Sequence, residues 1–149
     1  PYSKACKGAE REYMIDDKFL CEEAVRAAAA AYAPYSGYKV GAALLCSDGS
    51  VYTGCNIENA SYSPTVCAER VAFFKAVSDG RTSFSAIAVA GGEGGNISGV
   101  FPPCGVCRQV MAEFCDPKEF RVLLVHSGGY EERTLDMLLP DGFSGRYVR

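Results

Sequence analysis

The stretch FSAIAVA, from Phe84 to Ala90, is a short and nearly unbroken apolar run. A run of this length is typical of a strand that lies buried in the centre of a sheet. The flanking sequence predicts a helix over residues 65–78, which Gly80 closes, and another helix over residues 104–115 after Pro102-Pro103. A buried strand between two helices favours an α/β fold.

The sequence outside this centre extends the same pattern. A first helix is expected over residues 16–32, ended by Pro34, and the tight turn Ser47-Asp48-Gly49 joins two strands into a hairpin. The other expected elements are strands over 40–46, 51–57 and 120–126, a short edge strand at 133–134 and a helical turn over 135–139; the glycine-rich residues 91–99 are expected to form a surface loop. These elements predict a three-layer α-β-α sandwich around a mixed five-stranded sheet. We expect a single domain over residues 1–149, with residues 1–15 as a flexible N-terminal segment.

Composition narrows the class of protein and its partners. The chain has 149 residues and a net charge of −3, which argues against a nucleic acid polymer as partner and leaves small neutral substrates open. No apolar run is long enough to span a bilayer, so no membrane partner is expected. The N-terminal residues 1–18 lack the apolar stretch of a secretory signal. The chain has eight cysteines, but it also has enough valine, isoleucine, leucine and phenylalanine to form a core without disulfides. We therefore expect a reducing, cytoplasmic location rather than a disulfide framework.

Two cysteine motifs carry the chemistry: Cys67-Ala68-Glu69, and the segment PCGVC from Pro103 to Cys107. Cys104 and Cys107 lie three positions apart, so on one helical turn both sulfurs face the same way. A helix N-terminus favours thiolate over thiol, and Cys67 supplies a third sulfur. Three ligands leave one position of a tetrahedral zinc ion open, as in catalytic zinc sites, where the metal activates a water molecule. Glu69 beside this position fits a carboxylate that moves protons.

Other interpretations of these cysteines are a redox pair, a structural zinc site, inert core thiols, or a zinc-stabilised binding module without catalysis. A structural zinc site needs four protein ligands, yet the chain has no second Cys-x-x-Cys, and its one histidine, His126, falls in an expected buried strand. Glu69 discriminates further, because a purely structural site has no use for a carboxylate beside an open coordination position.

The order Cys-Ala-Glu followed by Pro-Cys-x-x-Cys resembles the signature of the zinc nucleobase deaminases. Further segments are similar to the small cytidine deaminases: Pro34-Tyr35-Ser36, VGAAL at 40–44, GCNIENASY at 54–62 and Leu138-Leu139-Pro140. The likeness extends from about Phe19 to Phe143. It implies a homotetramer with one zinc ion per subunit. It also implies hydrolysis of cytidine and deoxycytidine to uridine and deoxyuridine with release of ammonia, a step of pyrimidine salvage.

The resemblance also implies roles for individual residues. Asn56 and Glu58 would hold the ribose 3′-hydroxyl, while Ala68 and Cys104 would present backbone groups to the base and Glu69 would bond the pyrimidine edge. Tyr38 matches a position where the family commonly has a phenylalanine near the substrate. Phe143 would reach into a neighbouring subunit's pocket, and Tyr35 and Tyr62 would line the pocket or the subunit interface. Taken alone, residues 56–58 also fit an ordinary turn, and Phe143 also fits a hydrophobic anchor for the C-terminal tail.

Three thiolates on a zinc ion give a net charge of −1, which makes a bound water less acidic. Arg70, next to Glu69, offers a remedy if its guanidinium donates hydrogen bonds to a ligand sulfur and withdraws that charge. The alternative is an arginine on the helix surface.

Two rival enzymes share the cysteine signature. A deaminase of modified nucleosides or antibiotics predicts a ribose-contact segment other than Asn56-Ile57-Glu58. A polynucleotide deaminase needs a strand channel with basic and stacking residues, whereas this chain is acidic and has no tryptophan.

Overall fold

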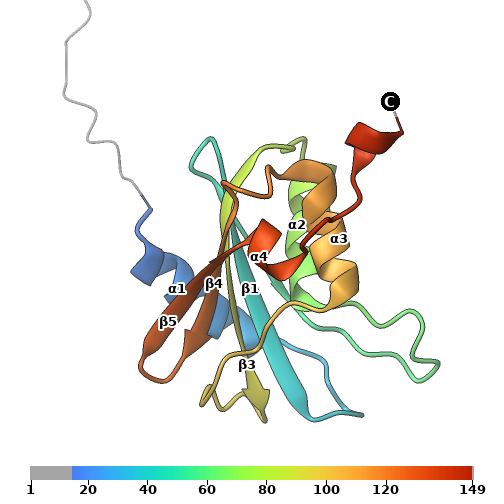
Figure 1. Ribbon diagram of the computed structural model, residues 1–149. Helices are drawn as coiled ribbons and strands as arrows, with labels where there is room; N and C mark the ends of the chain where they lie inside the picture. The colour runs from blue at the N-terminus through green and yellow to red at the C-terminus, as the bar shows by residue number, and fades with distance from the viewer. Residues whose placement is uncertain (1–14, 149) are drawn as a thin grey trace, which may run out of the picture.

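The computed structural model describes residues 15–148, which form one sheet with helices packed on both of its faces (Figure 1). The elements are α1 (Asp17–Ala28), β1 (Tyr38–Cys46), β2 (Val51–Cys55), α2 (Ala68–Ser78), β3 (Phe84–Glu93), α3 (Gly105–Phe114), β4 (Arg121–His126), β5 (Gly129–Thr134), α4 (Leu135–Leu138) and a 3-10 turn (Gly145–Tyr147). Within these residues, no helix combines the length and the apolar character needed to cross a membrane.

The sheet has the strand order β2-β1-β3-β4-β5, with the expected buried strand β3 at its centre. β3 pairs with β4 in parallel, and the other three pairs are antiparallel. This confirms the prediction of a mixed five-stranded sheet.

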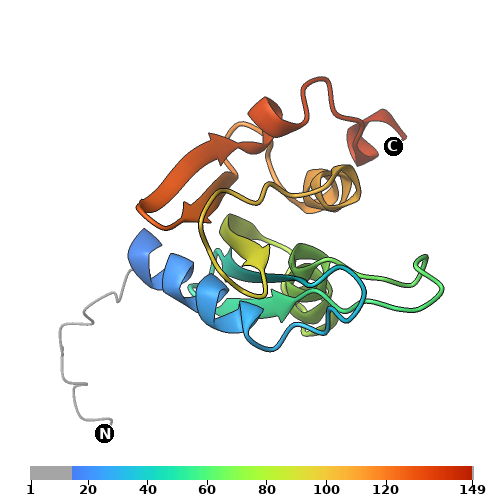
Figure 2. The ribbon, with the colours of Figure 1, turned by 90° about the horizontal axis from the view of Figure 1, so that it is seen from below.

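Each face of the sheet is covered by its own helical layer, as Figure 2 shows. On the first face, Leu20 and Ala24 of α1 pack against Ala88 and Leu123 of the sheet. On the other face, α2 and α3 contribute Phe73 and Met111 to a larger core that includes Ile87 and Val122. The three-layer prediction is therefore confirmed. Of the expected flexible segment 1–15, only Ile15 lies within the described residues, and it packs against the core on the α1 side.

Two glycines allow the helices to lie directly on the strands. A Cβ atom on Gly41 of β1 would come within 2.0 Å of the Ala24 carbonyl oxygen in α1. A Cβ atom on Gly54 of β2 would come within 2.3 Å of the carbonyl oxygen of Ala68, the first residue of α2. Gly54 therefore fixes how closely the beginning of α2 approaches the sheet.

α1 ends and α2 begins several residues inside the predicted limits, because loop residues form strand-like bridges instead. α1 ends at Ala28 rather than at residue 32, since the Tyr32 N–H donates to the Asn56 carbonyl over 3.0 Å. α2 begins at Ala68 rather than at residue 65, since Val66 pairs with Ile57 in an antiparallel bridge. For the same reason β2 ends at Cys55, two residues before the expected end.

The glycine-rich loop was expected to begin at residue 91, but β3 continues to Glu93. Gly91 and Gly92 belong to β3, where they pair with Val40 and Lys39 of β1. A Cβ atom on Gly92 would come within 1.8 Å of the Asn96 carbonyl oxygen, so the glycines here allow the following turn to fold back on the strand. The edge strand is also longer than the predicted 133–134, because all of Gly129–Thr134 pairs with β4.

Candidate active site

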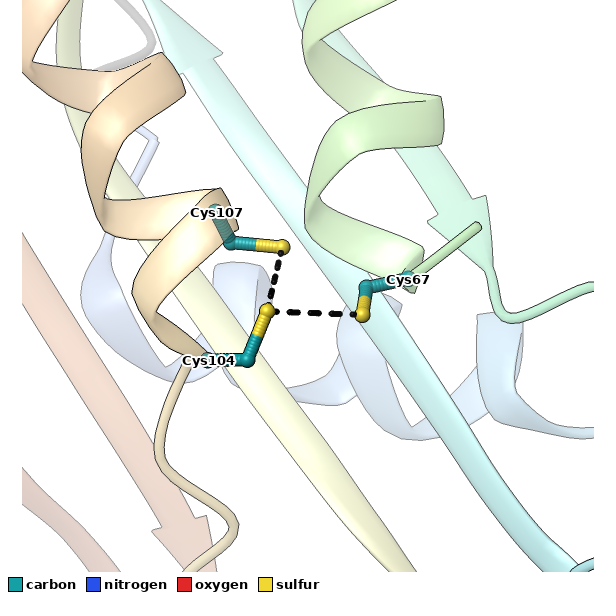
Figure 3. A group of neighbouring side chains, drawn as sticks. All are labelled: Cys67, Cys104 and Cys107. Carbon is teal, nitrogen blue, oxygen red and sulfur yellow. Dashed lines mark hydrogen bonds between the residues drawn. The ribbon is translucent and has the colours of Figure 1, made fainter. Parts of the chain in front are cut away.

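The N-termini of α2 and α3 bring the three predicted sulfur ligands together (Figure 3). Cys67 and Cys104 are the N-cap residues of α2 and α3, and both have extended backbone. Cys107 lies in the first turn of α3, facing the core. The free backbone N–H groups at these two helix starts favour thiolates at the caps.

The spacing of the sulfurs fits a tetrahedral zinc ion. Cys104 Sγ lies 3.7 Å from Cys67 Sγ and 3.6 Å from Cys107 Sγ, and all three sulfurs lie within 4.8 Å of one another. Tetrahedral Zn–S bonds of 2.3 Å place neighbouring sulfurs about 3.8 Å apart. Within residues 15–148 the cluster holds three ligand atoms and no fourth, and His126 ends β4, where its Nδ1 accepts from the Gly128 N–H. The donor set therefore suits a zinc ion with one open position.

Electrostatics within the cluster favour a thiolate at Cys67. A hydrogen bond with the Cys107 thiol, together with Arg70 and Cys104, lowers the pKa of Cys67 to about 5. The same hydrogen bond and burial raise the pKa of Cys107, so within this pair Cys107 is the residue that keeps its proton.

Glu69 is the only buried charged residue among residues 15–148, with 3% of its surface exposed. Burial raises the pKa of Glu69 to about 7. A carboxyl with such a pKa can both accept and release a proton near neutral pH.

The Arg70 guanidinium lies against the sulfur cluster. Its Nη2 donates to Cys67 Sγ over 3.5 Å. Its Nε is buried and has no hydrogen-bond partner among the described residues. Arg70 is therefore directed at the cysteines rather than at a carboxylate.

A cavity of about 200 Å³ opens beside the cluster, lined by Cys67, Ala68, Glu69 and Cys104, and by Asn56 and Glu58 from the loop after β2. The Asn56 side chain accepts from the Val40 N–H and donates to the Tyr38 carbonyl, each over 2.8 Å, and is thereby fixed against β1.

Glu58 accepts three hydrogen bonds, from the backbone N–H groups of Tyr35 and Ser36 and from the Ser36 hydroxyl. The Ser36 hydroxyl and then the two N–H groups hold the pKa of Glu58 below its ordinary value. Glu58 is therefore an ionised carboxylate at the cavity wall.

The predicted aromatic residues lie at different distances from this cavity. Tyr35 and Tyr62 line an adjoining cavity of about 320 Å³ that shares Ser36, Glu58 and Thr65 with the first. Their rings meet edge to face, and Tyr62 has a left-handed φ of 60°. Tyr38 packs beside Phe101, which does line the first cavity. Phe143 lines neither cavity; it stacks on Tyr147 and is 57% exposed.

Several wall residues were given no role in the site by the sequence, among them Ser36, Thr65 and Phe101. Ser36 was the most accessible to prediction, because it belongs to the Pro-Tyr-Ser segment and a serine before a glycine is a natural hydrogen-bonding turn residue. Phe101 carries no local signal, since its contact with the site depends on how the loop after β3 returns to α3.

Comparisons with known proteins agree with this geometry. Residues 14–123 match the family model for the cytidine and deoxycytidylate deaminase zinc-binding region. The chain is 52% identical over 130 residues to a cytidine deaminase from Sporosarcina psychrophila, which covers 87% of this chain and 93% of that protein. It is 50% identical over 131 residues to a cytidine deaminase from Halalkalibacterium halodurans, covering 87% of this chain and 96% of the other.

A solved structure shares the fold as well. The crystal structure of cytidine deaminase from Burkholderia pseudomallei superposes with a TM-score of 0.79 at 45% identity, over 87% of this chain and all of that one. The family match spans most of the chain, including both cysteine motifs. This chain therefore belongs to the cytidine and deoxycytidylate deaminase family.

Proposed function

We propose that this enzyme is a zinc-dependent cytidine deaminase that hydrolyses cytidine and deoxycytidine to uridine and deoxyuridine and releases ammonia. The observation that carries the proposal is the cluster of Cys67, Cys104 and Cys107 at tetrahedral spacing, with the buried Glu69 beside it in one cavity. The names of the relatives support cytidine as the substrate.

The three cysteines would hold one zinc ion, which when bound acts as a Lewis acid that makes water nucleophilic at neutral pH. Glu69 takes the proton from the attacking water and passes it to N3 of the pyrimidine. As the C4–N bond breaks, Glu69 moves the second proton to the leaving amine, so that cytidine and water give uridine and ammonia. The raised pKa of Glu69 suits both transfers.

Arg70 would balance the charge of the site. Its hydrogen bond to Cys67 Sγ reduces the negative charge that three thiolates place on the metal. A less electron-rich metal is the stronger Lewis acid, so Arg70 would favour deprotonation of water without touching the substrate.

Asn56 and Glu58 would bind the ribose 3′-hydroxyl. A carboxylate offers about four lone-pair sites, and Glu58 uses three within the described residues, so one remains for a substrate hydroxyl. Asn56 Nδ2 has a second N–H besides the one given to Tyr38. The backbone of Ala68 and Cys104 would contact the base, and Tyr38 would stand near the ring beside Phe101.

We further propose a homotetramer in which neighbouring subunits complete the pockets. The support is two pairs of exposed aromatic residues, Phe143 stacked on Tyr147 and Tyr62 against Tyr35, with Phe143 57% and Tyr62 72% exposed. Contiguous exposed apolar surface marks protein interfaces, where aromatic residues are enriched. Phe143 would enter a neighbouring pocket, and Tyr35 and Tyr62 would lie at the same boundary. A cluster of three thiolates fits a reducing cytoplasm, where the enzyme would serve pyrimidine salvage.

A substrate panel tests the proposal. Purified protein with measured zinc content is incubated separately with cytidine, deoxycytidine, deoxycytidylate and a cytosine-containing single-stranded oligonucleotide, and ammonia is measured. We expect about one zinc ion per chain and rapid release from the two nucleosides only. Turnover of the oligonucleotide or the nucleotide in preference to cytidine would contradict the proposed substrate class, and full zinc loading without any nucleoside turnover would contradict the reaction.

A further inference from the structure

Arg108 follows the ligand Cys107 on α3, yet its guanidinium bonds two backbone carbonyls rather than a carboxylate. Its Nε donates to the Pro103 carbonyl over 2.7 Å, and its Nη1 donates to the Leu138 carbonyl over 2.5 Å. Within the described residues Arg108 forms no salt bridge. One half-buried side chain therefore joins two segments that are distant in sequence.

The Pro103 carbonyl belongs to residues 103–107, which carry Cys104 and Cys107 and are called here the metal-binding loop. Pro103 is buried and directly precedes Cys104, and its carbonyl accepts no other hydrogen bond among residues 15–148. A buried carbonyl without a partner costs about 1–3 kcal/mol, so the Arg108 bond fixes the orientation of this peptide group. Because the Pro103 carbonyl is in the peptide that links to Cys104, this bond also restrains the backbone from which the Cys104 side chain extends.

The second carbonyl begins the C-terminal segment. Leu138 is the last residue of α4, and a carbonyl at the end of a helix has no partner within that helix. Phe143 lies a few residues after Leu138, and its carbonyl accepts a hydrogen bond from Gln109 Nε2 over 2.8 Å. Two successive residues of α3 thus hold residues 138–143.

We propose that Arg108 is a positioning residue that couples the metal-binding loop to the C-terminal segment 138–143. A metal held by Cys104 and Cys107 fixes the Pro103 carbonyl. This carbonyl fixes the Arg108 guanidinium, and the guanidinium holds the end of α4. Coupling of this kind is reciprocal, so loss of the metal loosens the segment and loosening of the segment weakens metal retention. The inference rests on the proposed zinc site but not on the identity of the substrate.

Two variants separate this role from a merely structural one. Arg108→Gln removes the bridge between the two carbonyls. Gln109→Ala is the matched control, because it removes the bond to Phe143 and leaves both Arg108 bonds in place. The readouts are the rate of zinc transfer to a chromophoric chelator and hydrogen–deuterium exchange of residues 139–147, with and without zinc.

For the wild type we expect removal of zinc to speed exchange in residues 139–147. Arg108→Gln should lose zinc about 10- to 100-fold faster, the usual effect of a residue that supports a metal ligand, and its exchange should no longer respond to zinc. Gln109→Ala should exchange faster in both states while keeping the wild-type response to zinc.

The coupling would be overturned if Arg108→Gln lost zinc at the wild-type rate. It would also be overturned if hydrogen–deuterium exchange of residues 139–147 in the wild type were the same with and without zinc. If circular dichroism shows that Arg108→Gln is unfolded, Arg108→Lys serves instead, since its single ammonium cannot bridge the two carbonyls with the fork of a guanidinium. A wild-type protein that holds no zinc would contradict the proposed metal site itself, which distinguishes that failure from failure of the coupling.

Discussion

Cys67 Sγ lies 3.7 Å from Cys104 Sγ, although 37 positions separate the two residues in the chain. The topology explains this closeness: α2 leads into β3 and α3 leads out of it, and the two helices lie on the same face of the sheet with their N-termini side by side (Figure 3). Each helix start contributes free N–H groups, so negative sulfur atoms from both can gather at one point.

Replacement of Arg70 by glutamine should lower turnover about 10- to 100-fold while the protein stays folded. The reason is the lost hydrogen bond to Cys67 Sγ, which leaves the charge of three thiolates uncompensated. Steady-state kinetics, zinc content and circular dichroism are measured together, with Arg26→Gln as the control, because Arg26 is exposed on α1, where it pairs with Glu23. Unchanged turnover and zinc content in Arg70→Gln would show that Arg70 is an ordinary helix arginine.

Replacement of Glu58 by glutamine should reduce kcat/KM for cytidine about 10- to 100-fold, the cost of losing a hydrogen bond to a charged group. The comparison substrate is 2′,3′-dideoxycytidine, which has no 3′-hydroxyl. If Glu58 binds that hydroxyl, the variant and the wild type should differ much less on this substrate. An equal loss on both substrates would instead assign Glu58 to holding the backbone of Tyr35 and Ser36.

Gly54→Ala should destabilise the protein by about 3 kcal/mol, at the upper end for overpacking. The added methyl group would meet the Ala68 carbonyl oxygen at 2.3 Å and the Ala72 nitrogen at 2.6 Å, both of them backbone atoms of α2 that cannot rotate away. Denaturant unfolding measures the effect. Gly99→Ala is the control, since a Cβ atom there meets no atom of residues 15–148 within 4 Å. Equal stabilities of the two variants would refute the close approach of α2.

Arg121 joins α1 to the β4–β5 edge by binding Asp17 and Glu132. Its hydrogen bonds lower the pKa of both carboxyls below their ordinary values of 3.8 and 4.5. Lowered carboxyl pKa values stabilise the folded state above the unfolded values, and that contribution disappears as the pH falls through the folded values.

Arg121→Gln should therefore lower the free energy of unfolding by about 1–2 kcal/mol at pH 7. The difference from the wild type should shrink as the pH falls from about 5 toward 3. Urea titrations of both proteins at several pH values measure it. A difference that stays constant over this range would mean that the two carboxyls do not titrate against Arg121.

The layers and the sheet were predictable because short apolar runs mark the buried strands, and proline and glycine residues mark where helices and turns begin and end. The residues at which helices and strands begin and end were harder to predict, since they depend on hydrogen-bond partners far away in the chain. Nothing local in residues 29–32 forbids a helix. The helix ends earlier because Tyr32 donates to the Asn56 carbonyl and accepts from the Glu58 N–H. The pairing of Gly91 and Gly92 with β1 is equally invisible in a run of glycines.

The candidate site divides in the same way. The gathering of Cys67, Cys104 and Cys107 beside Glu69 was predictable, because the roles proposed for them need particular residue types at particular spacings. The bridge made by Arg108 was not predictable, because it joins two backbone carbonyls that only the folded chain brings together.

The most direct test of the account compares wild type and Glu69→Gln at equal zinc loading, by the change in ultraviolet absorbance of cytidine. We predict that the wild type removes the cytidine band and that Glu69→Gln, still folded and holding its zinc, is slower by about 10²- to 10⁴-fold. Equal rates would contradict the role of Glu69 as proton carrier, and no absorbance change in either zinc-loaded protein would contradict cytidine deamination itself.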